Sequence, residues 1–320
     1  MSKNFALIGA AGYIAPRHMK AIKETGNNLV AALDPYDGIG VMDSYFPEAS
    51  FFTEYERFDR FIDKWRRERD KKIEYISITS PNYLHDSHIR FALKSGADAI
   101  CEKPLVLNPH NLDQLKIIEA ETGKKVYNIL QLRLHPSIIA LKERVSKELK
   151  ENPDKIYDID LTYLTSRGKW YFISWKGNQE KSGGIASNIG VHFYDMLSWI
   201  FGEVEENVVH LKTPDSNAGF FKLKNATVRW FLSVKYDYIP NEVKERGLTT
   251  YRSITVDGEE IEFSGGFTDL HTRSYEEILK GNGFGLDEAY GSIRTVATIR
   301  NQEAIGMQGE YHPFVKKVLA

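Results

Sequence analysis

The sequence predicts an α/β protein of two domains, with a doubly wound parallel sheet first and then an α+β domain built on an open, mainly antiparallel sheet. Two observations predict this class. Through the N-terminal part, short continuous apolar runs alternate with amphipathic stretches, as in parallel sheets that are buried on both faces. In the second half, strand-like alternation of apolar and polar residues dominates. We place the boundary at residue 131, which gives domains 1–131 and 132–320.

The first domain is predicted to alternate strands with helices. Residues 58–65 place their apolar side chains on one helix face, and Asn108 with Pro109 forms a typical helix start. Such an alternation implies right-handed crossovers, which bring the carboxyl ends of the strands to one edge of the sheet. The expected strands are residues 5–10, 28–34, 73–79, 97–102 and 125–132, and the expected helices are residues 16–25, 58–65, 85–96 and 108–123.

The second domain is predicted to be a sheet flanked by two helices. Asp257-Gly258 is a strong turn signal for a hairpin. An open sheet face rich in aromatic residues is seldom left in water, so we expect self-association as a dimer or a tetramer. The charged stretch 142–155 is expected to be a solvated helix and linker. The expected strands are residues 155–165, 208–213, 226–238 and 251–265, and the expected helices are residues 191–202 and 272–283.

Composition excludes several classes of protein. A net charge of −2, from 42 basic and 44 acidic residues, gives no general attraction to nucleic acid or to an anionic membrane. Cys101 is the only cysteine, which excludes an intramolecular disulfide and leaves no cysteine set for a zinc site. The sequence shows neither a signal-peptide pattern nor an apolar stretch of membrane-spanning length. We therefore expect a cytoplasmic protein with no nucleic-acid or membrane partner.

The stretch GAAGYIA, residues 9–15, follows the first expected strand and opens a helix. Gly9 and Gly12 would let the backbone approach a pyrophosphate, whose charge is favourable at a helix N-terminus. The spacing G-x-x-G-x-x-A is one residue longer than the common G-x-G-x-x-G fingerprint, and Ala15 takes the third place. Glycine-rich turns between a strand and a helix occur in many proteins, so this turn alone does not decide the ligand.

Asp34 supplies a second signal, because it ends the second expected strand. An acidic side chain at that place receives the adenine-ribose hydroxyls of a dinucleotide, and a plain turn residue in LDPYDG is the alternative interpretation. The glycine turn and Asp34 together predict a dinucleotide site. No arginine directly follows Asp34, so we expect NAD rather than NADP.

Two later loops are expected at the same edge of the sheet. TSPNYLHDSHI, residues 79–89, could pack along the nicotinamide side of a dinucleotide or could be an ordinary turn and helix cap. In Glu102-Lys103-Pro104, the charge of Lys103 could lower the pKa of a substrate hydroxyl, and a solvated loop lysine is the alternative. The residues expected to bind the cofactor are Gly9, Gly12, Tyr13, Ile14, Asp34, Thr79, Ser80, Pro81, Asn82, His85, Glu102 and Lys103.

SGGIASNIGVHFYDML, residues 182–197, carries the candidate base of the second half. Asn188, His192 and Asp195 are spaced to share one face of a helix. A neutral imidazole can accept an alcohol proton as hydride leaves, whereas a lone histidine on a helix is more often a structural hydrogen-bonding group. Asparagine is a poor transition-metal ligand, and His192 has no histidine four residues away, so we expect no metal.

SRGKWYFISWKG, residues 166–177, mixes cationic and aromatic side chains. Arg167 and Lys176 would suit the phosphates of a nucleotide, and the ring of Trp175 would suit its base. A sheet edge or a subunit contact explains the same composition equally well.

Together these stretches resemble the Gfo/Idh/MocA family, which includes glucose–fructose oxidoreductase and inositol dehydrogenase. The resemblance rests on GAAGYIAPRH, TSPNYLH, CEKPL, RLHP and GGIASNIGVHFYD, in the family's order over nearly the whole chain. It implies an N-terminal Rossmann domain, and a lysine and a histidine that flank the substrate carbon exchanging hydride with the nicotinamide. Those roles fall on Lys103 and His192. Asn188 replaces the family's aspartate, which removes a charge near the substrate, whereas Asp195 matches the family.

Within the family, residues 5–23, 33–61 and 267–289 look like the UDP-N-acetyl-D-glucosaminuronate 3-dehydrogenases of bacterial surface-polysaccharide synthesis. This resemblance implies oxidation of the sugar 3′-hydroxyl to a ketone, tightly held NAD and, in some members, reoxidation of the cofactor by 2-oxoglutarate. A UDP-sugar would also give the arginines an anionic partner. The residues expected to bind it are Lys103, Arg133, Arg167, Trp175, Asn188 and His192.

We therefore expect a dehydrogenase whose nicotinamide ring lies between Lys103 and His192. His192 would take the hydroxyl proton while Lys103 polarises the oxygen, and the sequence leaves the reverse assignment open. An NAD-dependent dehydrogenase of a free sugar or a cyclitol is the alternative among enzymes. A non-catalytic sensor of NAD or a sugar is the alternative outside them, and the presence of both Lys103 and His192 argues against it.

Overall fold

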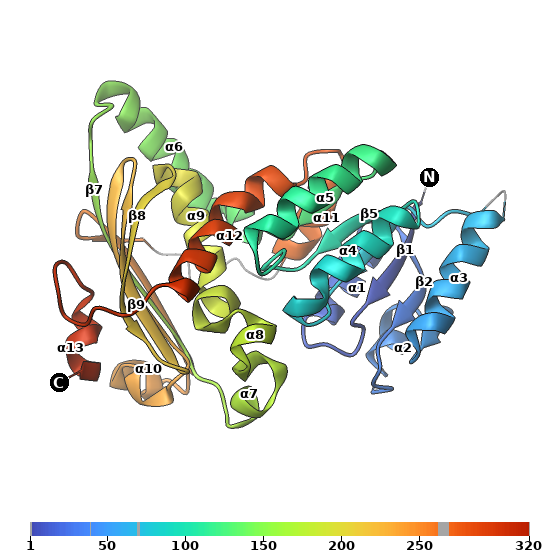
Figure 1. Ribbon diagram of the computed structural model, residues 1–320, viewed down its shortest axis with the longest axis horizontal. Helices are drawn as coiled ribbons and strands as arrows, with labels where there is room; N and C mark the ends of the chain where they lie inside the picture. Colours follow the sequence, from blue (N-terminus) through green and yellow to red (C-terminus); the bar gives the residue numbers. More distant parts are fainter. Residues whose placement is uncertain (1, 39, 69–70, 262–268, 320) are drawn as a thin grey trace. The chain divides into compact units, whose positions relative to one another are not determined.

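The computed structural model describes residues 2–38, 40–68, 71–261 and 269–319 (Figure 1). These residues form two compact units. The first unit contains the described residues of 1–131 and 268–290, and the second contains those of 132–267 and 291–320. The chain thus returns to the first unit after leaving it, whereas the sequence-based division assigned everything after residue 131 to the second domain.

The returning segment forms helix α11 (Leu270–Leu279). Its Tyr275 stacks on Phe5 of the first sheet, with ring centroids 5.8 Å apart, and Ile278 belongs to the same core cluster. The helix expected over residues 272–283 is therefore present, but the expectation that it flanks the second sheet is wrong. An apolar helix face fits either sheet, and local periodicity cannot tell which one it covers.

The first sheet has six strands in the order β3-β2-β1-β4-β5-β6, and every neighbouring pair is parallel. This arrangement confirms the doubly wound parallel sheet. The strand order reverses between β1 and β4, where ligands of such folds bind at the carboxyl ends of the strands. The sequence did not reveal β3, which is only 3 residues long. The strands are β1 (Asn4–Ile8), β2 (Asn28–Leu33), β3 (Ser50–Phe52), β4 (Tyr75–Ile78), β5 (Asp98–Cys101) and β6 (Val126–Asn128).

Helices connect these strands. Helix α1 packs beside α2 and α11, and α4 packs beside α5, the pair that Figure 1 shows in front of the sheet. The four helices expected in this part of the chain are confirmed, with ends that differ by a few residues. The helices are α1 (Ala15–Glu24), α2 (Val41–Tyr45), α3 (Tyr55–Arg67), α4 (His85–Lys94) and α5 (Pro109–Thr122).

The second unit contains a mixed sheet in the order β12-β11-β7-β10-β9-β8. Strands β7 and β10 are parallel, and the other described pairs are antiparallel, which confirms the mainly antiparallel sheet. Asp257 and Gly258, with φ of 52° and 81°, form the expected turn between β11 and β12. The expected strand 251–265 is described only as far as Ile261. The strands are β7 (Tyr157–Thr165), β8 (Val204–Lys212), β9 (Ser216–Leu223), β10 (Ala226–Ser233), β11 (Thr250–Val256) and β12 (Glu259–Glu260).

One face of this sheet packs against helices. Tyr194 of α9 lies edge-on to Phe221 and Trp230, with ring centroids 5.0 and 5.3 Å away. Helix α6 buries Leu141 and Val145, so the charged stretch expected to be solvated has one buried face. The helices are α6 (Pro136–Glu151), α7 (Trp170–Ile173), α8 (Gln179–Ser182), α9 (Val191–Phe201), α10 (Asn241–Glu245), α12 (Leu286–Asn301), which begins in the first unit, and α13 (Pro313–Leu319).

The opposite face of the second sheet has its own apolar cluster. Phe231, which alternates with Trp230 along β10, packs there with Val243 of α10 and Val315 of α13. Part of the face expected to be open is therefore covered within the chain. The dimer or tetramer stays a prediction. Among the described residues, no helix combines the length and the apolar character needed to cross a membrane.

Candidate active site

The turn between β1 and α1 approaches the next loop of the first unit closely. Gly9 has a φ of +94°, and a Cβ there would lie 2.6 Å from the backbone nitrogen of Ser80. The hydroxyl of Thr79 lies 3.0 Å from the Ile8 carbonyl oxygen and 2.9 Å from that of Gly9. Position 9 therefore accepts only glycine, for both conformational and steric reasons. Gly12 is less crowded, since its nearest neighbour would be the Gly9 carbonyl oxygen at 3.1 Å.

Asp34 is connected to this turn. Its Oδ2 accepts a hydrogen bond from the backbone N–H of Ala11 at 3.0 Å, and its Oδ1 accepts one from Tyr36 at 3.0 Å. Helix α1 begins without a side-chain cap on its first N–H groups within the described structure. An uncapped helix start beside a glycine turn suits a pyrophosphate, and a carboxylate has about four acceptor sites, enough to accept ribose hydroxyls in addition. These residues fit a dinucleotide.

Two exposed tyrosines belong to the same segments. Tyr13 of the turn is 87% exposed, and Tyr36, two residues after Asp34, is 76% exposed. Ile14 beside Tyr13 is half-buried. Tyr13 is among the residues predicted from sequence to bind the cofactor, and Tyr36 is not. The signal available for Tyr36 was its place directly beyond the expected ribose-binding acid, where an exposed ring is able to stack on a base.

His85 connects the loops that follow β4 and β5. Its Nε2 lies 2.8 Å from the carbonyl oxygen of Ser80, and its Nδ1 lies 2.8 Å from that of Pro104. Burial lowers the pKa of His85, and the two carbonyl oxygens together with the Glu102 carboxylate oppose that change. The Ser80 side chain also contacts Nδ1 of His88, at 2.9 Å. Burial lowers the pKa of His88 to about 4.

Glu102 lies in a buried polar cluster that also contains two histidines. Its Oε1 accepts hydrogen bonds from Nε2 of His18 at 3.0 Å and from Nε2 of His271 at 2.9 Å. Its Oε2 accepts one from the backbone N–H of Lys103 at 3.2 Å. The hydroxyl of Tyr275 lies 2.7 Å from Nδ1 of His18. Glu102 is among the residues predicted from sequence, whereas the two histidines and the tyrosine are not.

The charges in this cluster follow from burial and hydrogen bonding. Burial alone would raise the pKa of Glu102, but the hydrogen bonds from His18 and His271 hold it well below its usual range. Burial lowers the pKa of His18. Glu102 is therefore an anion and His18 a neutral imidazole at pH 7. The potential metal-ligand atoms of Glu102, His18 and His271 lie within 4.8 Å of one another, a spacing that could hold a metal ion. In the structure these atoms are hydrogen-bonded to one another instead. The expected absence of a metal stays a prediction.

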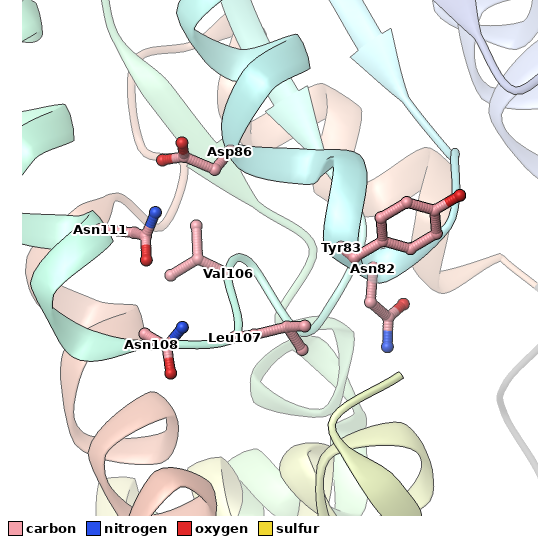
Figure 2. A pocket seen from close by; sticks show the side chains of 7 residues that line it. All are labelled: Asn82, Tyr83, Asp86, Val106, Leu107, Asn108 and Asn111. Atoms are coloured by element: carbon pink, nitrogen blue, oxygen red, sulfur yellow. The ribbon is translucent and has the colours of Figure 1, made fainter. Parts of the chain in front are cut away.

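A hollow of about 240 Å³ lies at the loops after β4 and β5 (Figure 2). Its walls carry mostly uncharged amide and apolar groups. The one carboxylate in the wall, Asp86, is paired with Arg90 at 2.8 Å. Such a wall suits neutral polar groups rather than an anion. The lining residues are Asn82, Tyr83, Asp86, Val106, Leu107, Asn108 and Asn111.

In the second unit, Arg133 pairs with Asp195. The guanidinium donates from Nε to Oδ2 at 2.9 Å and from Nη2 to Oδ1 at 2.7 Å, and both side chains are buried. This bidentate pair joins the start of the second unit to α9, three residues beyond His192. Arg133 is predicted to face an anionic substrate, and in the structure its guanidinium is paired with Asp195. The substrate contact stays a prediction. Sequence could not reveal this pair, because its members are far apart along the chain.

Asn188 does not lie on α9. Residues Ala186–Gly190 form a π-helical turn, and α9 begins at Val191, so the expected single helix through Asn188, His192 and Asp195 is interrupted. A Cβ on Gly190 would lie 2.6 Å from Leu232, which fixes the turn tightly against β10. The Asn188 amide donates to the Tyr171 hydroxyl at 2.9 Å. Irregular helical turns of this kind are frequent at functional sites.

The cationic and aromatic segment 166–177 folds into short helical turns. Nζ of Lys176 lies 4.5 Å from the ring centroid of Trp175 and 5.5 Å from that of Trp170. Arg167 donates to the carbonyl oxygen of its neighbour Ser166 at 3.1 Å. Trp170 is 53% exposed. The segment therefore presents cations and rings together, as a nucleotide or a partner surface would require.

The structure gathers the expected residues into two sets. The first unit brings together the glycine turn, Asp34, the loop 79–85 and Lys103, with Pro81 and a buried Asn82 in that loop. The second unit contains Arg133, Arg167, Trp175, Asn188 and His192. Lys103 and His192 thus belong to different units, and each is half-buried. Their common role stays a prediction.

Comparison with known families supports this division. Residues 3–129 match the family described as "Oxidoreductase family, NAD-binding Rossmann fold", and residues 154–229 match its "C-terminal alpha/beta domain". Among curated relatives, the D-glucoside 3-dehydrogenase of Escherichia coli K12 is 23% identical over 62% of this chain and 53% of its own length. The 2,7-anhydro-N-acetylneuraminate hydratase of Mediterraneibacter gnavus is 26% identical over 64% of this chain and 50% of its length. The chain spans about half the length of these curated relatives.

Solved structures give longer matches. The WlbA (WbpB) dehydrogenase from Thermus thermophilus, in complex with NAD and alpha-ketoglutarate, is 53% identical, with a TM-score of 0.93 over 98% of this chain and 99% of that chain. A complex of the Thermus thermophilus dehydrogenase with NAD and UDP-GlcNAcA matches at 52% identity and a TM-score of 0.92 over 98% and 99% of the two chains. The WlbA dehydrogenase from Bordetella pertussis is 18% identical over 93% and 94% of the chains, with a TM-score of 0.75, and shares the fold.

Proposed function

The chain belongs to the Gfo/Idh/MocA oxidoreductase family, and we propose that it is an NAD-dependent dehydrogenase of UDP-N-acetyl-D-glucosaminuronate (UDP-GlcNAcA). The reaction proposed is oxidation of the sugar 3′-hydroxyl to a ketone. The observation that carries this proposal is the 52% identity, over 98% of this chain, to a dehydrogenase whose crystals hold NAD and UDP-GlcNAcA. The related complex with alpha-ketoglutarate supports 2-oxoglutarate as the compound that reoxidises the cofactor.

The first unit would hold the cofactor through its glycine turn. Gly9 and Gly12 leave the backbone open to the pyrophosphate at the start of α1, and the remaining acceptor sites of Asp34 suit the adenine-ribose hydroxyls. Asp34 also favours NAD over NADP, since a carboxylate repels a 2′-phosphate. When bound, NAD supplies the hydride acceptor.

The chemistry on the substrate would come from Lys103 and His192. We assign the hydroxyl proton to the imidazole of His192, and the stabilisation of the same oxygen, as its charge grows, to the ammonium group of Lys103. Asn188, hydrogen-bonded to Tyr171, brings an uncharged amide where the family places a carboxylate. It is able to bind a sugar hydroxyl without adding charge beside His192.

The substrate's diphosphate and uracil would bind the segment 166–177. Lys176 and Arg167 supply positive charge, and the rings of Trp170 and Trp175 are of a size to stack on a base. The guanidinium of Arg133 is paired with Asp195 through Nε and Nη2, and its expected contact with the substrate stays a prediction. The same segment also suits a contact between subunits of a dimer or a tetramer.

One assay tests substrate and reaction together. Purified protein is incubated with UDP-GlcNAcA and NAD, with and without 2-oxoglutarate, while absorbance of reduced nicotinamide is followed. Mass spectrometry then searches for a 3-keto sugar and for 2-hydroxyglutarate. Ketone formation is the expected result, and its dependence on 2-oxoglutarate would show that the cofactor is recycled in place.

Absence of oxidation, in protein that binds NAD, would overturn the proposed substrate. The second candidate is a dehydrogenase of a free sugar, which the match to the D-glucoside 3-dehydrogenase favours. The double variant Arg167→Ala/Trp175→Ala distinguishes the two candidates. It weakens a UDP-sugar by losing nucleotide contacts and leaves the KM for a free sugar unchanged. A place in surface-polysaccharide (O-antigen) synthesis and a cytoplasmic location stay predictions.

A further inference from the structure

The backbone on both sides of the Lys103 side chain is held by buried groups. On one side, the N–H of Lys103 donates to Oε2 of Glu102 at 3.2 Å. On the other side, the carbonyl oxygen of Pro104 lies 2.8 Å from Nδ1 of His85. Glu102 is 6% exposed and His85 is 1% exposed, so water does not compete for these bonds.

Glu102 is itself fixed by groups from two helices. A carboxylate oxygen only accepts, so His18 of α1 and His271 of α11 must both carry hydrogen on Nε2. In neutral His18, Nδ1 is then an acceptor, and the Tyr275 hydroxyl donates to it at 2.7 Å. Tyr275 in turn accepts from the hydroxyl of Ser77, 2.6 Å away. Along this series of hydrogen bonds, from Ser77 to Glu102, each hydrogen has one consistent position, so the carboxylate of Glu102 is held rigidly.

His85 is fixed in a different way. Both ring nitrogens face carbonyl oxygens, that of Pro104 and that of Ser80, each at 2.8 Å. Carbonyl oxygens only accept, so two full hydrogen bonds require the ring to donate from both nitrogens. Burial outweighs the nearby Glu102 carboxylate and lowers the pKa of His85, so the neutral ring donates one of these hydrogen bonds while its other nitrogen lies against the second carbonyl oxygen. The ring thereby connects the loop that begins at Ser80 to the loop that carries Lys103.

We propose that Glu102 and His85 are positioning residues for Lys103, and that His271 and His18 act through Glu102. This inference rests on the proposed function, since it takes Lys103 as the catalytic lysine. In this role Glu102 and His85 act through the backbone around Lys103, and their expected contacts with the cofactor stay a prediction. A misplacement of about 1 Å at a reacting group can reduce turnover about 10²-fold.

The test uses a matched set of variants of the full chain. His271→Met fills the same space without an N–H donor, and His271→Gln restores a donor near the position of Nε2. His110→Gln, on the exposed surface of α5, is the control for exchanging a histidine. Should His271→Met fail to fold, Tyr275→Phe tests the other histidine that holds Glu102, because it removes the hydroxyl that fixes His18.

Two readouts are compared. The first is kcat and KM, with NAD affinity measured separately. The second is hydrogen–deuterium exchange, followed by mass spectrometry on the peptide that contains the Lys103 amide. We expect His271→Met to lower kcat 10- to 100-fold, with KM and NAD affinity within about twofold of wild type, and to speed exchange at Lys103. His271→Gln should restore most of the kcat and of the slow exchange at Lys103, and His110→Gln should change neither quantity.

Each contrary result overturns the proposal. Unchanged exchange at Lys103 in His271→Met would show that the cluster does not hold that backbone. Faster exchange with unchanged kcat would show that holding it is unimportant for catalysis. If the wild-type protein does not oxidise UDP-GlcNAcA, the proposed substrate fails instead. The exchange experiment still tests the positioning role in that case, because it needs no substrate.

Discussion

The two units each bury a carboxylate beside a proposed catalytic residue, and they treat its charge differently. Glu102 directly precedes Lys103, and its side-chain partners are the imidazoles of His18 and His271. Asp195 follows His192 on α9, and its partner is the guanidinium of Arg133. Both carboxylates are nearly inaccessible, with exposed fractions of 6% and 2%.

The two sites differ in the net charge that remains once the carboxylate is paired. A carboxylate with a bidentate arginine forms a neutral pair, so α9 is fixed without a net charge near His192. An imidazole can donate an N–H while it is uncharged, as His18 does, so its hydrogen bond does not cancel the negative charge that Glu102 carries beside Lys103. Burial alone therefore does not determine the electrostatics of a site, because the type of partner determines whether a charge survives.

The largest expected effect is on turnover. Replacing His192 with Ala removes the proposed base while leaving the Arg133–Asp195 pair in place. We expect kcat to fall about 10²- to 10⁴-fold with NAD affinity near that of the wild type, because general-base catalysis contributes about that much. Steady-state kinetics and NAD titration check this. Turnover near the wild-type value would remove His192 from the mechanism and leave Asp195 with a purely structural role.

The second effect is on stability, in the second unit. Asp195→Asn keeps the shape of the side chain but leaves the buried guanidinium of Arg133 without a counter-charge. Breaking a buried pair in this way costs about 3–5 kcal/mol. Urea unfolding at pH 7.5 measures it. The double variant Arg133→Met/Asp195→Leu is the control, since it removes both charges, and it should recover most of the loss.

In the first unit, the corresponding variant Glu102→Gln should reduce the free energy of unfolding by less than Asp195→Asn does. Glu102→Gln also replaces an acid with its amide, but the partners it leaves behind are the imidazoles of His18 and His271 rather than a permanently charged guanidinium. The loss is confined to hydrogen bonds, about 1–3 kcal/mol in the free energy of unfolding. Equal costs for Asp195→Asn and Glu102→Gln would contradict the comparison, because they would mean that the histidines carry charge too.

The sequence predicted the frame of both regions but not these pairs. Continuous apolar runs identify β1, β2, β4, β5 and β6, because a strand buried on both faces carries mostly apolar residues. Gly9 and Asp34 were found because close backbone approach and ribose binding require particular residue types at strand ends. Lys103 and His192 became candidates through their places at a strand end and on a helix, and the resemblance to a family assigned them their shared catalytic role.

What escaped the sequence was long-range or irregular. His271 reaches Glu102, and Tyr275 reaches His18, only because α11 returns to the first unit. Nothing in the local pattern of that helix says which sheet it covers. The π-helical turn at Ala186–Gly190 reads as ordinary helix, since its residues keep helical spacing. One signal was available and was not used: His271 and Tyr275 are four residues apart, so they share one helix face with the buried apolar positions.

The smallest expected effect is the loss of folding stability at low pH. One buried histidine in each unit, His88 and His312, allows the two units to be compared. Burial lowers the pKa of His88 in the first unit and of His312 in the second to about 4, and burial also lowers those of His18 and His85 in the first. The unfolded chain binds these protons from about pH 6.5 downward while the folded chain does not, so stability is lost as the pH falls from 6.5 towards 4.

One such histidine accounts for about 1.4 kcal/mol of lost stability at pH 5.5 relative to pH 7.5. We expect His88→Gln and His312→Gln each to reduce the acid loss by about that amount in urea unfolding at the two pH values. His110→Gln, an exposed histidine, should leave the loss unchanged. Because the first unit keeps His18 and His85 as well, the tryptophan signal of Trp65 should report unfolding at a higher pH than that of Trp230. Unfolding of the second unit first would mean that its neutral Arg133–Asp195 pair protects it less than the charged Glu102 cluster protects the first.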